Sequence, residues 1–348
     1  MNRRDELIRR FPALALLPPG TYVVGGAVRD LELGLDPADA DVASVDALAT
    51  AQLLGRKVIP LGTVEHLSAY RVVDGEHVYD FAPLLEANID RDLRRRDFTV
   101  NAMAVDLATG ELLDPHDGRG DLARRVVRMV EASNFDDDPL RMLKAVRMAV
   151  KYRFEIDPET LEAIRSRASA ILSVAAERIA YELSVIFSSN AFRRSLALLH
   201  ETRLDEPLGI GTHGEFHGGE LSLAASYALI IRDVHAFAKQ FRWSDVLRRD
   251  VETLQRLIDD HSLIALYDAG RDVALQLPPL LHALGRDDRI VMPDFDARAL
   301  LTGDEIASLA PDARGPRIGA LKRALLEAQL RGDITTREEA EAFVTASA

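Results

Sequence analysis

Two aspartates, Asp39 and Asp41, lie two positions apart in a stretch whose pattern predicts a short strand. Alternate side chains of a strand point to the same face, so the two carboxylates would lie side by side. Like charges this close repel each other unless a cation lies between them. Carboxylate oxygens suit Mg²⁺, which proteins usually hold through one or two carboxylates together with substrate phosphates. The pair indicates a metal site for phosphoryl transfer, although an acidic loop without a metal has the same composition.

A glycine turn precedes the acid pair. Gly25 and Gly26 connect a β-prone run at residues 21–24 to a helix-like run at 27–33. Free backbone N–H groups at such a turn favour an anion, and Arg29 in the first helical turn could reach the same phosphates. The alternative interpretation is a tight turn that needs positive φ, with Arg29 as an ordinary solvated charge.

The elements that must position these residues form a mixed α/β head followed by helices. We expect further strands at residues 39–43, 57–60, 67–73 and 77–81, a hairpin of 102–106 with 112–114, and a helix at 47–54. After about residue 133, helical spacing predicts helices at 139–152, 158–168, 175–187, 191–201, 221–241, 246–267, 304–309 and 318–331, and at most a short one at 279–284. The Gly-rich stretch 209–219 indicates a loop or boundary. The fold class is therefore α+β, with a small mixed sheet in the head and an all-helical remainder.

The composition limits the possible functions. The chain has 348 residues and no Cys, which excludes disulfides and thiolate metal sites and fits a reducing compartment. No apolar stretch reaches membrane-spanning length, so we expect a cytoplasmic protein without a membrane partner. The net charge of -13 argues against a general nucleic-acid binder unless positive charge is local. Arginines do cluster at residues 91–96, 119–128 and 141–153, where the alternative is solvated surface charge.

Five motifs, in order along residues 21–204, resemble those of the class II tRNA nucleotidyltransferase and bacterial poly(A) polymerase family. They are GGAVRD at 25–30 with Gly34, Asp39 and Asp41; RRDFTVNAMA at 95–104; Asp114 with GRGDL at 118–122 and Arg128; DDPLRMLKAVR at 137–147; and AAERIAYEL at 175–183. The resemblance implies a nucleotidyltransferase head in residues 1–132 and a helical neck for nucleobase recognition and RNA binding in 133–204. Residues 205–348 would then be a helical body and tail in contact with tRNA.

The chemistry that the resemblance implies is attack of an RNA 3′-hydroxyl on the α-phosphate of a nucleoside triphosphate, which expels pyrophosphate. Asp39 and Asp41 would be catalytic ligands of Mg²⁺. Asp80, on the neighbouring predicted strand, would be a third catalytic carboxylate or, alternatively, a structural acid. The implied nucleotide-binding residues are Gly25, Gly26, Arg29, Arg95, Arg96, Asp97, Asn101, Asp137, Asp138, Arg141 and Arg147. Arginine would donate to phosphate and Asp97 would accept from a ribose hydroxyl, whereas Asn101 could be only a turn or cap residue.

Asp138 and Arg141 predict how a base could be selected without a template. They stand three positions apart, so on a helix they would share a face. A carboxylate accepts hydrogen bonds and a guanidinium donates them, which complements the amine and ring nitrogen that cytosine and adenine both present. Uracil and guanine would leave mismatched groups unpaired. The alternative is a salt bridge or cap at the start of the helix.

The resemblance therefore implies a CC- or CCA-adding enzyme, which adds C from CTP to the tRNA 3′ end, with ATP as a further candidate substrate and no predicted protein partner. The stretch between residues 81 and 94 is compact, which is typical of members that add CC alone. The alternatives are a poly(A) polymerase and a non-catalytic RNA-binding relative, but the latter would not need the acid pair. A dinucleotide-binding oxidoreductase is excluded because no G-x-G-x-x-G motif opens the helix.

Overall fold

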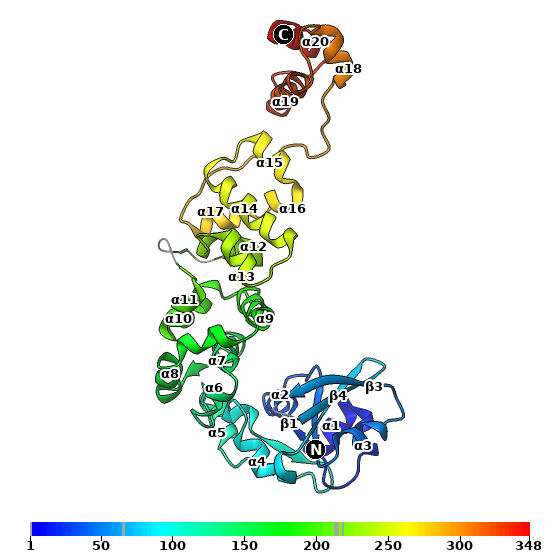
Figure 1. Cartoon of the computed structure of the whole chain (residues 1–348), viewed down its shortest axis with the longest axis vertical. Helices are drawn as coiled ribbons and strands as arrows, with labels where there is room; N and C mark the ends of the chain where they lie inside the picture. The colour runs from blue at the N-terminus through cyan, green and yellow to red at the C-terminus, as the bar shows by residue number, and fades with distance from the viewer. Residues whose placement is uncertain (1, 65–66, 212–215, 218) are drawn as a thin grey trace. The chain divides into compact units, whose positions relative to one another are not determined.

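The computed structural model describes residues 2–64, 67–211, 216–217 and 219–348. The described chain divides into two compact units (Figure 1). Unit 1 comprises Met1–Ser189 with Arg194–Leu208, and unit 2 comprises Asn190–Arg193 with Gly209–Ala348. The predicted loop or boundary begins where unit 2 resumes, although residues 212–215 and 218 of that stretch lie outside the described residues. Within the described part of the chain, no helix combines the length and the apolar composition that a membrane span requires.

A seven-stranded sheet forms the centre of the head in unit 1. Its strands are β1 (Tyr22–Val24), β2 (Ala40–Ser44), β3 (Val58–Val64), β4 (Leu67–Asp74), β5 (His77–Pro83), β6 (Ala104–Asp106) and β7 (Leu112–Leu113). They lie in the order β3-β4-β5-β2-β1-β6-β7, with β2 and β5 parallel and the other described pairs antiparallel. This confirms the predicted mixed sheet. It also makes β2 and β5 direct neighbours.

Short helices surround the sheet (Figure 1). They are α1 (Arg3–Arg10), α2 (Gly26–Glu32), α3 (Ala47–Gln52), α4 (Ile89–Arg94) and α5 (Gly118–Arg124), with 3₁₀ turns η1 (Pro12–Leu16), η2 (Leu85–Ala87) and η3 (Thr99–Asn101). α4 starts where the Asn88 side chain accepts from the backbone N–H groups of Asp90 and Arg91. α5 approaches η3 so closely that a β-carbon on Gly118 would lie 2.4 Å from the carbonyl oxygen of Thr99. Only a residue without a side chain permits this contact.

The neck continues unit 1 as a group of packed helices. They are α6 (Asn134–Asp137), α7 (Leu140–Tyr152), α8 (Pro158–Arg165), η4 (Ala168–Ser173), α9 (Ala176–Phe187), α10 (Phe192–Glu201) and α11 (Asp205–Leu208), joined to the head by a parallel pair of β8 (Val126–Val127) and β9 (Glu155–Ile156). α7 buries the apolar residues of its helical repeat, such as Leu143 and Val146, against its neighbours, α9 among them. Its less buried positions include Arg141, Lys144 and Arg147, so one side of α7 is basic.

Unit 2 is helical, and it confirms the predicted helices at 304–309 and 318–331 but divides the two longest predicted ones into shorter helices. They are α12 (Leu223–Ile230), α13 (Val234–Gln240), α14 (Asp245–Asp259), α15 (Leu263–Ala269), α16 (Arg271–Ala274), α17 (Leu277–Ala283), α18 (Gly303–Leu309), α19 (Pro316–Arg331) and α20 (Arg337–Ser347). The predictions of single helices at 221–241 and 246–267 are wrong. Each run is interrupted by a polar residue, Asp233 or Ser262, whose side chain accepts from a backbone N–H and starts a new helix.

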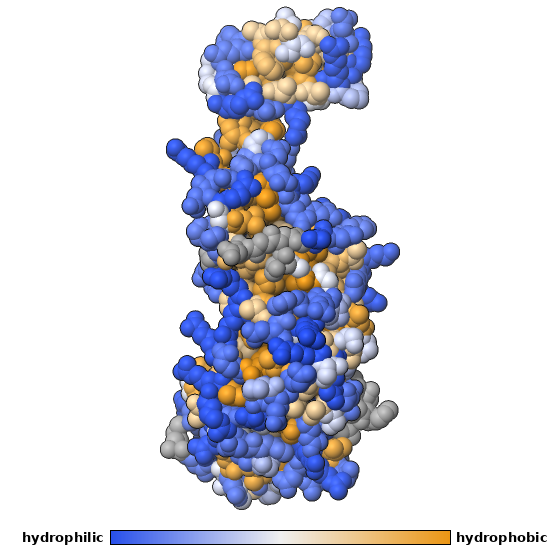
Figure 2. Space-filling view, turned by 90° about the vertical axis from the view of Figure 1, so that its left-hand side faces the viewer, coloured by the Kyte–Doolittle hydropathy of each residue, from blue (hydrophilic) through white to orange (hydrophobic). Residues whose placement is uncertain are grey.

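The last three helices, α18 to α20, enclose a hydrophobic core of their own. Its buried residues include Leu301, Ile306, Leu321, Leu325 and Val344. α18 and α20 each begin with a capping box, in which a Thr side chain and a Glu side chain satisfy each other's backbone N–H groups. Figure 2 shows one face of the molecule, on which hydrophilic residues predominate and hydrophobic ones gather in small patches.

Candidate active site

Asp41 lies at the centre of the head, half-buried on β2 and directly opposite Asp80 of the parallel strand β5. Burial raises the pKa of Asp41 to about 6; the charge of Arg96 opposes this rise, the charges of Asp39 and Asp80 add to it, and the charge of Arg29 opposes it. β2 begins at Ala40, so Asp39 precedes the strand by one residue. The site therefore concentrates negative charge that a cation would relieve, which fits the residues to a divalent metal.

Asp80 has a partner that sequence reasoning missed. Arg71 faces Asp80 across the β4–β5 pair, and its Nε and Nη2 donate to the two carboxylate oxygens at 2.7 and 2.6 Å. Among the described residues, no three acidic or histidine side chains form a group that could hold a metal. A cation here would therefore depend on Asp39, Asp41 and substrate oxygens, as is usual for Mg²⁺. The role of Asp80 as a third ligand stays a prediction.

At the glycine turn the guanidinium of Arg96 and the carboxylate of Asp41 lie close together. Gly25 caps the start of α2 with φ of +71°, a conformation that favours glycine. A β-carbon at this position would lie 2.8 Å from Nη1 of Arg96 and 3.2 Å from Oδ2 of Asp41. The predicted tight turn with positive φ is thus present, and the absence of a side chain also leaves room for Arg96 beside Asp41. Gly26, the next residue, lies against the guanidinium of Arg29.

A buried aspartate, Asp92, orients both arginines of the second motif. Nε and Nη2 of Arg95 donate to Oδ1 of Asp92 at 3.0 and 2.7 Å, and Nη2 of Arg96 donates to Oδ2 at 3.0 Å. Asp92 is 1% exposed. Burial raises the pKa of Asp92, but the charges of Arg96 and Arg95 and their hydrogen bonds outweigh it, so the net shift is downward. Sequence analysis missed Asp92, although its spacing of three and four residues from the arginines is the helical signal for such pairs.

Arg29, Asn101 and Asp97 form a continuous polar chain beside the turn. Nη1 of Arg29 donates to Oδ1 of Asn101 at 2.6 Å, and Nδ2 of Asn101 donates to Oδ1 of Asp97 at 2.9 Å. The Arg29 side chain is 11% exposed, so its interpretation as a solvated surface charge is wrong. Asn101 lies in η3 and connects two side chains, which is more than a turn or cap residue does.

The predicted base-reading residues lie differently from the expectation. α7 begins at Leu140, and Asp138 precedes it with an extended φ of −142°, so the argument that Asp138 and Arg141 share a helical face is wrong. Oδ2 of Asp138 accepts from Nη2 of Arg178 on α9 at 2.9 Å, a contact that sequence reasoning missed. Nη1 of Arg141 donates to the carbonyl oxygen of Asn134 at 2.9 Å.

The two remaining members of the predicted nucleotide-binding set have different surroundings. Asp137 is exposed on α6. Arg147 lies against α9, where its Nε donates to the buried carboxylate of Glu182 at 2.7 Å. The predicted nucleotide-binding set thus divides into a cluster in the head, which includes Arg29 and Arg96, and a group where α7 and its preceding residues meet α9. Two ion pairs, Asp138–Arg178 and Arg147–Glu182, connect α7 and the residues just before it to α9.

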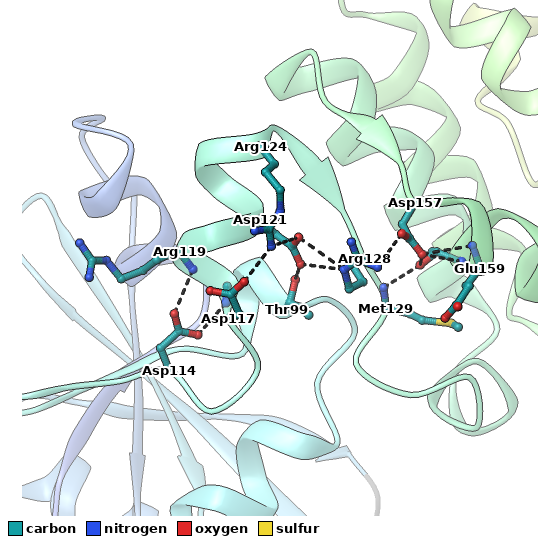
Figure 3. A network of polar contacts seen from close by, with 12 residues as sticks. Thr99, Asp114, Asp117, Arg119, Asp121, Arg124, Arg128, Met129, Asp157 and Glu159 are labelled. Carbon is teal, nitrogen blue, oxygen red and sulfur yellow. Dashed lines mark hydrogen bonds and ion pairs between the residues drawn. The ribbon is translucent and has the colours of Figure 1, made fainter.

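A polar network connects η3 to the neck (Figure 3). The buried carboxylate of Asp121 accepts from the Thr99 hydroxyl at 2.7 Å and from Nε of Arg128 at 3.1 Å. Nη1 of Arg128 also donates to Asp157 at 2.5 Å, and Asp157 caps α8 by accepting from the backbone N–H of Glu159. The η3 turn, which carries Asn101, is therefore linked to the start of α8 in the neck.

Two segments of the chain match described protein families. Residues 21–128 match the family described as "Poly A polymerase head domain", and residues 153–208 match "Probable RNA and SrmB- binding site of polymerase A". The first match contains the acid pair, the glycine turn and the Arg95–Asn101 motif. The second contains Asp157, Arg178 and Glu182.

Known proteins resemble the chain over most of its length. The A-adding tRNA nucleotidyltransferase of Deinococcus radiodurans is 31% identical over 97% of this chain and 98% of its own. The CC-adding tRNA nucleotidyltransferase of a Synechocystis species is 40% identical over 51% of this chain and 44% of its own. The crystal structure of the Bacillus stearothermophilus CCA-adding enzyme in complex with CTP shares the fold with a TM-score of 0.75 at 21% identity, covering 100% of this chain and 98% of that one.

Proposed function

This chain belongs to the family of tRNA nucleotidyltransferases and poly(A) polymerases, and we propose that it adds nucleotides to the 3′ end of tRNA without a template. The substrates we propose are CTP, with ATP as a further candidate, and a tRNA that lacks part or all of its terminal CCA. The products are the extended tRNA and pyrophosphate. We place the reaction in the cytoplasm.

The observation that carries the proposal is the convergence at the glycine turn. A β-carbon on Gly25 would touch both Arg96 and Asp41, so one cation for phosphate and one acid for metal lie within a few ångströms of each other. Nucleotidyl transfer needs this combination because positive charge must hold the triphosphate while acids hold the metal beside the reacting phosphorus. Burial raises the pKa of Asp41, which is consistent with a site that a bound cation would stabilise.

The residues take distinct roles in this proposal. Mg²⁺ held by Asp39 and Asp41 would supply activation of the 3′-hydroxyl and balance for the charge that develops on the phosphate. Arg95 and Arg96, which Asp92 holds in place, bind the triphosphate through charge-assisted hydrogen bonds. Asp138 and Arg141 read the amine and ring nitrogen of cytosine or adenine.

One observation supports the addition of C to the tRNA and another supports the addition of A. The link between β5 and the Arg95 motif is short, because η2 and α4 fill residues 85–94, and the resemblance associates a compact link with CC addition. We therefore propose CC addition first. A-adding activity is the second candidate, because the full-length relative from Deinococcus radiodurans bears that name.

The test is an extension assay on four tRNAs that lack CCA, end in the first C, end in CC, or are complete. Each labelled triphosphate is supplied alone and in mixtures with Mg²⁺. CC addition predicts two added residues on the first tRNA and one on the second with CTP alone, and no extension of the third by ATP. A single A on the third tRNA with no C added to the first two would support the A-adding candidate, whereas C added to the first two and A to the third would indicate CCA addition. Long A tracts on many RNAs would indicate a poly(A) polymerase. No extension of any tRNA, with Asp41→Ala as the inactive control, would refute the proposal.

A further inference from the structure

The last residue of α7, Tyr152, contacts the head at the glycine turn. Its ring lies under the guanidinium of Arg29, with 4.8 Å from Cζ of Arg29 to the ring centroid. Its hydroxyl donates to Oδ1 of Asp30 at 2.9 Å. Asp30 also accepts from Nε of Arg29 at 2.9 Å, so Tyr152 engages both members of the Arg29–Asp30 pair. Sequence analysis assigned Tyr152 no role.

Contacts with Tyr152, Asp30 and Asn101 hold the guanidinium of Arg29 in one direction. One face of its guanidinium lies against the Tyr152 ring, and Nη2 lies 3.5 Å from the β-carbon position of Gly26. Nη1 donates to Asn101. An arginine side chain normally loses considerable rotamer freedom when it binds a ligand, so a guanidinium already held in one direction binds phosphate at a lower entropic cost.

The Tyr152 hydroxyl stays a hydrogen-bond donor at physiological pH. Burial raises the pKa of Tyr152 to about 12; the charge of Arg29 opposes this rise, and the charge of Asp30 adds to it. The ring therefore remains neutral and the guanidinium stacks on a neutral aromatic face, the arrangement in which cation–π attraction is favourable. A leucine at this position would keep the bulk but lose both the π face and the hydroxyl.

We propose that Tyr152 is a positioning residue that directs Arg29 toward the triphosphate of the incoming nucleotide. The inference rests on the proposed function, because it takes Arg29 as a phosphate ligand. Tyr152 itself touches no substrate. It acts through Arg29 and Asp30, so its effect falls on the part of the nucleotide that all four triphosphates share.

This role predicts a specific pattern of losses. Tyr152→Leu weakens the binding of CTP and of ATP by the same factor, about fivefold, and weakens the binding of inorganic tripolyphosphate by that factor too. Tyr152→Phe keeps the stacked ring and loses only the bond to Asp30, so its affinities stay within about twofold of those of the unmodified protein. The preference between CTP and ATP is unchanged in both variants.

The experiment is calorimetric titration of the full chain with tripolyphosphate, CTP and ATP in the presence of Mg²⁺, without RNA. Lys57→Ala is the control, because Lys57 is an exposed lysine that takes no part in the contacts among Arg29, Asp30 and Tyr152, and it leaves all three affinities unchanged. Unchanged tripolyphosphate affinity in Tyr152→Leu would overturn the inference, as would an equal loss in Tyr152→Phe. A loss confined to CTP or to ATP would also overturn it, because the effect would then reach the base.

The two proposals fail in distinguishable ways. If the chain does not transfer nucleotides, the unmodified protein extends no tRNA, whatever Tyr152 does to tripolyphosphate binding. If only the inference is wrong, the unmodified protein extends tRNA and binds tripolyphosphate, and Tyr152→Leu does both equally well. Kinetic measurements on active protein give a further separation, because a positioning effect on nucleotide binding raises KM while kcat changes little.

Discussion

Asp41 is a single acid whose surroundings differ strongly from those of a surface carboxylate. It is half-buried on β2, with Asp80 directly opposite and Asp39 two residues away, and Arg96 beside the same turn. Burial and the neighbouring acids together raise its pKa to about 6, although Arg96 opposes the rise. An ionised Asp41 is therefore unfavourable in the metal-free protein. Substrate-binding sites commonly store such a cost, which the bound cation then relieves.

The first prediction concerns the stability of Asp41→Asn. The folded-state pKa of about 6 lies above the ordinary value of 3.8, so ionisation of Asp41 lowers the free energy of unfolding as pH rises between these values. The loss reaches about 3 kcal/mol at most by pH 7. Asp41→Asn removes it, so the metal-free variant is more stable than the unmodified protein at pH 7 but not at pH 4, and it is inactive.

Urea unfolding with a chelator, compared at the two pH values, checks this difference. Asp36→Asn is the control, since the Asp36 side chain is 92% exposed. Equal stability of Asp41→Asn and the unmodified protein at pH 7 would contradict the prediction.

The second prediction concerns base selection at Arg141. Arg141→Ala removes a donor from the proposed base-reading pair, so discrimination of CTP against UTP falls by about 10- to 100-fold. Single-turnover incorporation of each triphosphate measures it. Lys144→Ala, one turn along the same helix, is the matched control and keeps the unmodified preference. Unchanged selectivity in Arg141→Ala would remove Arg141 from base reading.

Residue spacing predicted only part of this site. The Gly25 turn follows from local pattern, because the glycine conformation is a property of a few neighbouring residues, whereas the strand predicted to contain Asp39 begins one residue after it. The hydrogen-bond partners of Asp80 and Asp30, by contrast, do not follow from local pattern. Asp80 finds Arg71 through strand pairing, and Asp30 finds Tyr152 across 122 positions of sequence. Such contacts depend on the tertiary arrangement, which spacing alone does not contain.

At the scale of elements, α4 acts as a support for the arginine motif. Its cap at Asn88 fixes where the helix starts, and that start places Asp92 one turn before Arg95 and Arg96. The buried carboxylate then binds both guanidinium groups. The direction of two phosphate-binding side chains therefore depends on one helix start.

The third prediction concerns Asp92→Asn. The neutral side chain leaves two guanidinium groups without their buried counter-charge, which lowers the free energy of unfolding by about 2 kcal/mol at pH 7, less than for a fully buried pair because both arginines are 21% exposed. The folded-state pKa of Asp92 is lowered, so this contribution is present above the ordinary pKa of 3.8 and is lost as pH falls through the lower folded value. Denaturant unfolding at pH 7 and pH 3 measures it.

Asp90→Asn is the control for this comparison, because Asp90 is exposed on the same helix. A pH-independent difference between Asp92→Asn and the unmodified protein would show that the charge of Asp92 is not what stabilises α4.

Helices were predicted well where apolar periodicity and caps agree, and poorly where they conflict. α7 and α9 begin within one residue of the expectation, since their apolar stripes match their packing. The runs at 221–241 and 246–267 are periodic throughout, yet Asp233 and Ser262 restart the helix within them. A cap competes with helix continuation by only about 1 kcal/mol, so the packing of the surrounding helices decides the outcome.

The whole molecule has a net charge of -13, so a positive surface for RNA can come only from local groups of basic residues. α7 is the clearest of these: it carries Arg141, Lys144, Arg147 and Lys151 and no acidic residue. An acidic chain repels a polyanion at long range, but short-range contacts to a basic helix still release counterions.

The fourth prediction is a small salt dependence of tRNA binding for a protein of this size. A plot of log affinity against log salt concentration has a slope of about −0.9 per phosphate contact for duplex DNA and about −0.7 for single strands, so Lys144→Ala and Lys151→Ala each make the slope for tRNA shallower by about one. Filter binding at salt concentrations from about 50 to about 200 mM measures this slope. Lys57→Ala, an exposed lysine outside α7, leaves the slope unchanged. A slope that neither α7 variant alters would place the phosphate contacts elsewhere.

The hydrophobic core enclosed by α18 to α20 determines which helices a mutation in that core affects first. Leu325 is fully buried among residues of that core, so its replacement by alanine opens a void whose strain falls first on these three helices. The lesion lies in unit 2, whereas Asp39 and Asp41 belong to unit 1, so the packing around the two acids contains none of the atoms that the mutation removes.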